Sequence, residues 1–289
     1  MNIVKISDGL GNQMFQYAFA RNMYIETGKP VYLDTRFINN EDMIARKEDN
    51  YKWSKNGYRN YGLNRFRIKL PCADNNVLKF WKYLTSTGIA QHEIYKMAQN
   101  GLWPWKYCDE EFSEIDIRSN LPTYYKGYFF DLKYFDNIKA TLQKEFVLKE
   151  KIHLPRELRN IIYNHETISL HVRRGDYIKL RWDISEREYY PKAVKFISQR
   201  VTSPVWLVFS DDIEWVKRHI KIDGKVIYIS DMGFQDYEEL MIMKHCKHNV
   251  IANSTFSYWA AYLNQNPDKI VVCPHNWMPK AIPCDWIDL

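Results

Sequence analysis

The sequence predicts an α/β protein of two domains, residues 1–150 and 151–289. Three observations predict this class. After about residue 151, five apolar runs alternate with helical stretches; the chain opens with a strand-helix-strand pattern; and 289 residues suit one large or two small domains. Such alternation predicts parallel strands with helices on both faces of the sheet.

In the first domain, apolar residues recur at helical spacing over 11–27, and Gly28 is suited to end that helix. Strands are expected on either side of the helix, at 2–7 and 30–34. Further along, the pattern predicts a helix over 76–100, a strand over 123–130 and the end of a helix over 141–150.

In the second domain, strand-like runs lie at 166–172, 204–210, 225–230, 249–252 and 269–273. Helical stretches lie between them, at 187–200, 212–220, 237–245 and 257–266. Consecutive parallel strands joined by helices should be connected with right-handed crossovers.

Composition excludes several classes of protein. No apolar run approaches the 20 residues that a membrane-spanning helix needs, and the first residues lack the features of a secretory signal. The five cysteines form no C-x-x-C pair, which fits a reducing cytosol. We therefore expect a soluble cytoplasmic protein. Its net charge of +6 favours anionic small ligands or contact with a membrane surface over duplex DNA.

Polar residues follow every predicted strand of the second domain. In open parallel sheets, ligands bind beyond the carboxyl ends of the strands, so these residues are candidates for a nucleotide-sized site. The segments concerned are 171–177, 210–212, 230–233, 253–257 and 274–277.

Two neighbouring arginines, Arg173 and Arg174, are the sharpest of these features. A guanidinium offers a fixed fork of donors that suits phosphate oxygens. The alternative is a structural ion pair with Asp176. Segment 253–257, N-S-T-F-S, lies where a strand turns into a helix; this is a good anion site, and its alternative is simple N-capping.

Two features of the first domain are also candidates. Two of the 11 glycines lie at positions 9 and 11, where a tight loop would put Asn12 and Gln13 into a cleft. Segment 51–69 interleaves basic and aromatic residues, among them Tyr58 and Tyr61, whose rings offer faces that can stack on sugars. A solvated basic loop is the alternative for this segment. Metal sites and a hydrolase triad find no support in the spacing of the residues.

Three blocks carry a resemblance to a known family: G-L-G-N-Q-M-F-Q-Y-A-F-A-R at 9–21, H-V-R-R-G-D-Y at 171–177, and C-K-H-N-V-I-A-N-S-T-F-S-Y-W-A-A-Y-L-N at 246–264. Together they resemble glycosyltransferase family 11, the α-1,2-fucosyltransferases of bacteria and animals. The resemblance implies a GT-B-like fold of two facing Rossmann-like domains with a cleft between them. It also implies GDP-L-fucose as donor, inversion at the anomeric carbon, and no metal or other cofactor.

The resemblance gives roles to residues of the second, donor-binding domain. Arg173 would bind the β-phosphate, and Arg174 would support the nucleotide or the block itself. His171 would contact guanine and Asp211 the nucleoside, while Glu239 stands where many relatives have Asp at the guanine. The segment at the helix start would bind the diphosphate through Asn253, Ser254, Thr255, Phe256 and Ser257.

The first domain would hold the acceptor, with Asn12, Gln13, Tyr58 and Tyr61 facing it. Arg173, Asn12 and Asp176 are the candidates for catalysis. A general base could be Asp8, Asp176 or Asp183, and the sequence does not decide between them.

The expected reaction is transfer of L-fucose to a hydroxyl, O2 of a galactoside, of an oligosaccharide or lipid-linked glycan, in the cytoplasm or at the inner membrane surface. Two alternatives stay open. One is a transferase that uses another GDP- or dTDP-deoxyhexose. The other is a non-catalytic nucleic-acid-binding module built on segment 51–69.

Overall fold

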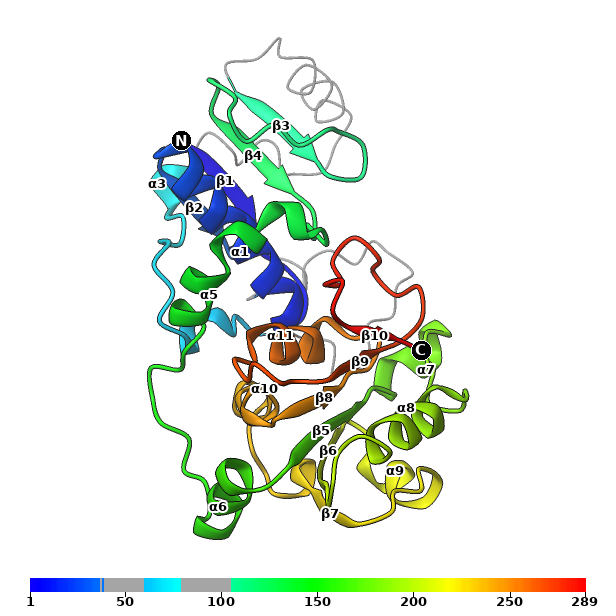
Figure 1. Ribbon diagram of the computed structural model, residues 1–289. Helices are drawn as coiled ribbons and strands as arrows, with labels where there is room; N and C mark the ends of the chain where they lie inside the picture. Colours follow the sequence, from blue (N-terminus) through cyan, green and yellow to red (C-terminus); the bar gives the residue numbers. More distant parts are fainter. Residues whose placement is uncertain (37, 39–59, 79–104) are drawn as a thin grey trace. The chain divides into compact units, whose positions relative to one another are not determined.

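The computed structural model describes residues 1–36, 38, 60–78 and 105–289 (Figure 1). The chain divides into two compact units, Met1–Lys149 and Glu150–Leu289. None of the helices in these described ranges is long and apolar enough to cross a membrane.

The first unit contains a parallel four-stranded sheet in the order β2-β1-β4-β3. Its strands are β1 (Asn2–Lys5), β2 (Val31–Asp34), β3 (Lys106–Asp109) and β4 (Thr123–Lys126). Helix α1 (Leu10–Thr27) joins β1 to β2 and ends, as expected, at Gly28, whose φ of 65° is left-handed. Short helices complete the unit: η1 (Leu63–Arg65), α3 (Asn75–Leu78), η3 (Leu132–Tyr134), η4 (Asp136–Ile138) and α5 (Lys139–Glu145).

Helix α1 is buried on almost every side, because aromatic residues surround it. Phe19 stacks on Phe129 with ring centroids 3.8 Å apart, and Phe15 meets Phe130 and Phe135 edge-on. Part of the high aromatic content of the chain therefore forms the core of the first unit.

The second unit contains a parallel six-stranded sheet in the order β10-β9-β8-β5-β6-β7. Its strands are β5 (Thr167–Val172), β6 (Val205–Ser210), β7 (Lys225–Tyr228), β8 (His248–Val250), β9 (Val271–Cys273) and β10 (Ile287–Asp288). Counted within this unit, the order is 6-5-4-1-2-3, which is the Rossmann order. The direction of winding reverses between β5 and β8.

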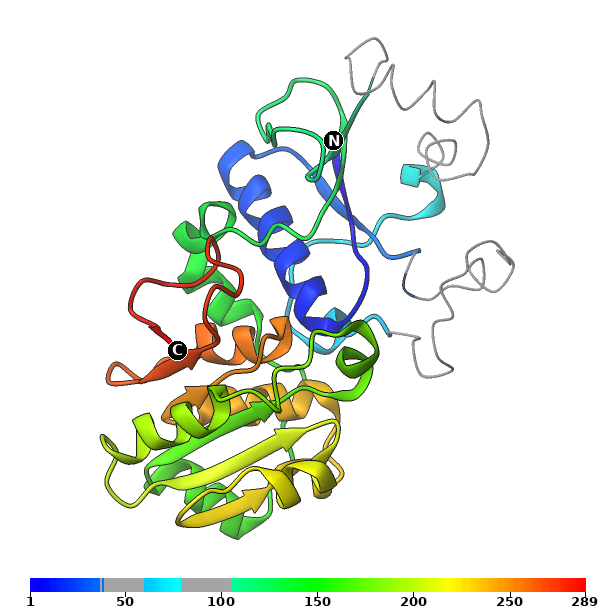
Figure 2. The same ribbon diagram turned by 90° about the vertical axis from the view of Figure 1, so that its right-hand side faces the viewer.

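Helices cover both faces of this sheet. They are α6 (Arg156–Asn164), α7 (Gly175–Leu180), α8 (Tyr189–Ser198), α9 (Ile213–His219), η5 (Ile229–Asp231), α10 (Asp236–His245) and α11 (Thr255–Leu263). Figures 1 and 2 show α8 and α9 on one face and α10 and α11 on the other. Side chains alternate along β5: Ile168, Leu170 and Val172 belong to the core under α8 and α9, so Ser169 and His171 point to the opposite face.

The two parallel sheets confirm the predicted α/β class; the facing arrangement with a cleft stays a prediction. Several details differ from the sequence-based expectation. Helix α7 directly follows the two arginines, and strands β3 and β10 were not expected. Helix α11 begins at Thr255, two residues before the expected start, because Ser254 caps it. Of the helix expected over 76–100, only 76–78 lies in the described ranges, within α3.

Candidate active site

The reversal of winding in the second unit places two loops side by side. Strands β5 and β8 are hydrogen-bonded neighbours, with Leu170 opposite Val250. Residues 171–174 and 251–254 therefore leave the sheet at the same edge. In doubly wound sheets, this reversal point opens a crevice at the carboxyl ends of the strands, where ligands bind. Both polar segments that were singled out in the second domain lie at this point.

Arg173 is held by two carboxylates while its side chain stays 21% exposed. Nη2 pairs with Oδ1 of Asp176, and Nη1 lies 2.8 Å from Oδ2 of Asp211. The ring of Tyr177 lies 5.3 Å from Cζ. The guanidinium is thus fixed in place and remains partly open to solvent, which suits a donor that must meet an anionic ligand without reorganising.

Arg174, in contrast, is buried, with 6% exposure. Nε lies 3.1 Å from Oδ2 of Asp212, and Nη1 lies 3.1 Å from Oδ2 of Asp183 and donates to the Ser185 hydroxyl. Cζ lies 3.7 Å from the ring centroid of Trp215. These contacts hold Arg174 within the block, and contact of Arg174 with the nucleotide stays a prediction. The ion pair with Asp176, the alternative considered for the two arginines, is made by Arg173.

Asp211 positions the arginine block. Oδ1 accepts the backbone N–H of Arg174 at 2.9 Å, and Oδ2 pairs with Arg173. A Cβ atom on Gly175 would lie 2.4 Å from Oδ2 of Asp211, so a side chain there would displace the carboxylate. The glycine of H-V-R-R-G-D-Y therefore makes room for Asp211, whose contact with the nucleoside stays a prediction.

The start of α11 shows which hydroxyls of N-S-T-F-S are used by the fold. Ser254 Oγ accepts the N–H of Phe256, so the N-capping alternative is correct for this residue. Ser257 is buried: its Oγ accepts the N–H of Ala252 at 3.2 Å and contacts the Ser254 carbonyl. The Ser257 hydroxyl therefore faces its own loop, which corrects the expectation that it binds the diphosphate. Thr255 and Phe256 are half-buried in the first turn.

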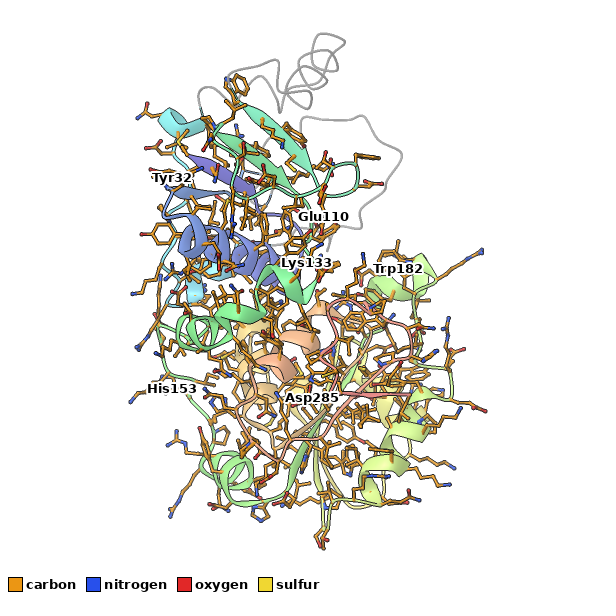
Figure 3. The ribbon with its side chains drawn as sticks, turned by 45° about the horizontal axis from the view of Figure 1, so that its top comes forward. Tyr32, Glu110, Lys133, His153, Trp182 and Asp285 are labelled. Atoms are coloured by element: carbon orange, nitrogen blue, oxygen red, sulfur yellow. The ribbon has the colours of Figure 1, made fainter. Side chains whose placement is uncertain are left out.

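Two buried polar atoms at this edge have no hydrogen-bond partner among the described residues: Nδ1 of His171 and Oδ1 of Asn253. The Asn253 amide donates to the carbonyl of Trp182, which follows α7 (Figure 3). Burial and the charge of Arg173 lower the pKa of His171 to about 3, so its imidazole is neutral. Unpaired buried polar atoms are rare, and they suit a place where a ligand completes the hydrogen bonding.

Glu239 lies on α10, and its carboxyl bonds to the Ser230 hydroxyl. Ser230 Oγ also accepts the N–H of Ser210 at 3.0 Å, which links Glu239 to the carboxyl end of β6. Burial, with a smaller contribution from Asp236, raises the pKa of Glu239 to about 7. Its carboxyl is therefore about half protonated at neutral pH.

The expected acceptor side looks different in the structure. Gln13 is fully buried: its amide donates to the carbonyls of Asp8 and Asn60, and its Oε1 accepts the N–H of Gly62. This corrects the expectation that Gln13 faces an acceptor, because every polar atom of the side chain is used within the fold. Asn12 is half-buried in the first turn of α1. Tyr61 is half-buried and its hydroxyl accepts from Cys72, whereas Tyr58 lies outside the described residues.

The loop before α1 takes its unusual backbone at an unexpected residue. Gly9 has an ordinary φ of −69°, and Gly11 lies within the helix; the left-handed conformation belongs to Asp8, with φ 66°. The unusual torsion of this loop therefore lies at Asp8 and not at Gly9 or Gly11. Asp and Asn are among the few non-glycine residues that adopt this conformation readily.

Several polar residues of the first motif have structural roles that the sequence analysis did not predict. Gln16 accepts the N–H of Ser7 and donates to the Gly127 carbonyl, and Tyr17 and Arg21 both bind Glu145. The available signal was their position on a helix that the periodicity already predicted. Within the described ranges, no group of three or more His, Cys, Asp or Glu side chains is placed to hold a metal ion.

Comparison with known protein families decides which family the chain belongs to. The family model described as Glycosyl transferase family 11 matches residues 1–282. The chain belongs to glycosyl transferase family 11.

The chain is also similar to curated glycosyltransferases over nearly its whole length. The chain is 28% identical to an α-1,2-colitosyltransferase of Escherichia coli, over 96% of the chain and 92% of the relative. It is also 28% identical to the Escherichia coli O-antigen biosynthesis glycosyltransferase WbnK, over 98% and 99%. The crystal structure of the fucosyltransferase NodZ from Bradyrhizobium is similar over 90% of this chain and 91% of that one, with a TM-score of 0.48 and 14% identity. As a family 11 member, the protein is a glycosyltransferase.

Proposed function

We propose that the protein transfers L-fucose from GDP-β-L-fucose to O2 of a galactoside, with inversion and without a metal ion. One observation carries the proposal for the donor. Arg173 lies at the reversal point of a Rossmann-ordered sheet, fixed by Asp176 and Asp211 and still partly exposed, in a chain of family 11.

The residues at this edge suit departure of a nucleoside diphosphate. As the bond from the sugar to the β-phosphate breaks, negative charge grows on the phosphate oxygens. Arg173 offers a charged donor, and the first turn of α11 adds N–H groups and the positive end of its dipole. The neutral His171 and the orphaned oxygen of Asn253 suit an uncharged, hydrogen-bonding part of the donor.

The acceptor is inferred from relatives. The chain is 29% identical to the mouse galactoside 2-α-L-fucosyltransferase Sec1, over 55% of this chain and 48% of the relative. The name of WbnK, an O-antigen biosynthesis enzyme, favours an oligosaccharide or lipid-linked glycan as acceptor. We place the reaction in the cytoplasm, with peripheral contact at the inner membrane surface, which fractionation of cells that express the full chain would test.

A second donor is favoured by one observation, the similarity to an α-1,2-colitosyltransferase over 96% of the chain. The protein would then transfer a different deoxyhexose by the same chemistry. A transferase of this kind would also use Arg173 and the first turn of α11. Competition between the two donors therefore has to decide which sugar is transferred.

The test is a transfer assay with lactose as acceptor and either GDP-L-fucose or GDP-colitose as donor, with and without EDTA. We expect fucosylated lactose, an α-1,2 linkage by NMR, and an unchanged rate in EDTA. GDP should raise Tm, whereas ADP and UDP should not. Transfer from GDP-colitose alone would favour the second donor. Oligonucleotide binding with a steep salt dependence and no transfer would favour the nucleic-acid-binding alternative.

A further inference from the structure

Asn253 lies between β8 and α11, at the carboxyl edge of the second sheet. Its Nδ2 donates to the carbonyl of Trp182 at 2.8 Å, in the segment after α7. A backbone carbonyl accepts only from a donor, so this contact fixes which end of the side-chain amide carries the nitrogen. The other end, Oδ1, is buried and has no hydrogen-bond partner among the described residues.

The chemistry of Oδ1 restricts what it can bind. An amide oxygen accepts hydrogen bonds, and the oxygens of an ionised diphosphate are acceptors as well, so the two cannot bond to each other. The partner of Oδ1 therefore has to be an O–H or N–H group. This differs from the diphosphate contact that the resemblance gives to Asn253.

Two aromatic residues connect Asn253 to Arg173. The Tyr177 ring lies 5.3 Å from Cζ of Arg173, and the rings of Tyr177 and Trp182 meet edge-on with centroids 5.6 Å apart. The N–H of Trp182 also donates to the Tyr177 carbonyl at 2.9 Å, and the Trp182 carbonyl accepts from Asn253. Asn253 and the guanidinium that we place at the β-phosphate therefore belong to one cluster of residues.

The order of the strands separates Asn253 from the residues predicted to contact the nucleoside. Asp211 follows β6, and Glu239 is linked to the end of β6 through Ser230. Asn253 follows β8, whereas β5, which leads to Arg173, lies between β6 and β8. A donor with its nucleoside at the end of β6 and its β-phosphate at Arg173 has its hexose on the side of β8.

We propose, on the basis of the proposed function, that Oδ1 of Asn253 accepts a hydrogen bond from a hydroxyl of the hexose that is transferred. Asn253 is then a specificity-determining residue, because a sugar without that hydroxyl leaves the buried oxygen unpaired. Sites that hydrogen-bond a substrate hydroxyl discriminate strongly against analogues that lack it. The bond would distinguish deoxyhexoses that differ in one hydroxyl, such as L-fucose and colitose, which has no hydroxyl at C3.

A hydroxyl reaches Oδ1 only after a small movement of a neighbouring segment, because the atom is shielded from solvent. Helix α7 and Trp182 can supply that movement, since none of the residues of α7 is buried and Trp182 is 57% exposed. Segments with few buried contacts open at a low cost in free energy. The contact therefore requires a local opening and no change in the sheet.

The first experiment measures the Kd of GDP-fucose and of GDP for wild type and Asn253→Ala by calorimetry, without acceptor. We expect Asn253→Ala to raise the Kd of GDP-fucose by about 5–10-fold, the effect of one hydrogen bond, and to leave that of GDP unchanged. Asn164→Ala, which removes an exposed asparagine amide at the end of α6, is the matched control and should change neither Kd.

The comparison of ligands shows which group Oδ1 meets. An equal rise in the Kd of GDP and GDP-fucose, or no rise in either, would overturn the proposal, because the contact would then not involve the hexose. With GDP-colitose, an unchanged Kd in Asn253→Ala would support a bond to the hydroxyl at C3, and a raised Kd would support a bond to a hydroxyl that both sugars carry. Wild type that does not bind GDP-fucose would contradict the proposed function itself.

A second variant keeps the acceptor atom and removes the amide donor. In Asn253→Asp, a carboxylate oxygen can still accept from the sugar hydroxyl, whereas the bond to the Trp182 carbonyl is lost. The added negative charge should weaken GDP at least as much as GDP-fucose, so the Kd of GDP-fucose relative to that of GDP should not rise. A rise of this ratio equal to that in Asn253→Ala would assign the effect to the lost bond with Trp182 and would overturn the proposal.

Discussion

At the carboxyl end of β1, Gln13 and Gln16 turn their side-chain amides back onto the loops beside α1 and are fully buried. At the carboxyl end of β5, Arg173 is also fixed by neighbours, yet a fifth of its side chain stays exposed. Both segments are polar and both follow the first strand of a parallel sheet. The difference lies in the side-chain partners, which are backbone groups in the first unit and carboxylates in the second.

This difference helps to tell the polar residues that hold the fold together from those that can bind a ligand. Backbone partners saturate a buried amide and leave it nothing to offer a ligand. Carboxylate partners orient a guanidinium whose remaining N–H groups can still meet an anion. Carboxylate partners alone do not make a site, because Arg174 also has two, Asp183 and Asp212. Exposure divides the two arginines: Arg174 is enclosed and 6% exposed, whereas the side chain of Arg173 is 21% exposed.

The largest effect is expected for Arg173→Ala. Loss of a donor that stabilises the leaving phosphate should lower kcat by about 10²–10³-fold, equivalent to about 3–4 kcal/mol of transition-state stabilisation. Arg173→Lys should also be poor, since an ammonium lacks the fork geometry. Steady-state kinetics with GDP-fucose measures both.

Arg200→Ala is the matched control, because Arg200 is an exposed arginine of the same unit whose guanidinium contacts Phe196 of α8. It should keep the wild-type kcat. Near-normal turnover in Arg173→Ala would remove the contrast on which the assignment of Arg173 rests.

Arg174→Ala should affect the free energy of unfolding instead. Removal of the guanidinium leaves Asp183 and Asp212 without their cation, and the partial exposure of Asp212 moderates the penalty. We expect a loss of about 2–3 kcal/mol in urea denaturation. A variant as stable as wild type, with a Kd for GDP raised about 10²-fold, would show that Arg174 binds the nucleotide directly.

Gln13→Ala sharpens the contrast within the first unit. It leaves the carbonyls of Asp8 and Asn60 and the N–H of Gly62 without their partner, so the free energy of unfolding should fall by about 2 kcal/mol. Asn12→Ala, at the neighbouring position, should instead lower kcat if Asn12 is catalytic. Equal stability of Gln13→Ala and wild type would contradict the scaffold role.

Most of the second sheet could be predicted, because its buried strands and amphipathic helices have clear periodicity. Helix α7 could not, since none of its residues is buried and a helix without a buried face has no apolar stripe. Strand β10 has two residues, too few for any pattern.

The site was predicted in position but not in detail. The alternation of strands and helices predicts a parallel sheet, and a parallel sheet places the site at the carboxyl ends of its strands. Which of two adjacent arginines becomes buried depends on Asp211 and Asp212, which lie 37 and 38 residues away. Likewise, Asp8 adopts the left-handed conformation because Gln13, five residues later, holds its carbonyl.

The smallest effect concerns Glu239, whose pKa is raised from 4.5 to about 7. An acid with a raised pKa binds more protons in the folded than in the unfolded state between these values, so stability is present below about pH 4.5 and is lost as pH rises through about 7. Glu239→Gln removes this titration, so wild type should lose about 1 kcal/mol relative to the variant between about pH 6 and about 7.5. Urea denaturation of both proteins across this range measures the difference, and the opposite titration of buried His171 cancels in it. A constant difference would mean that Glu239 is ionised throughout this range and that its carboxyl meets the donor as an anion.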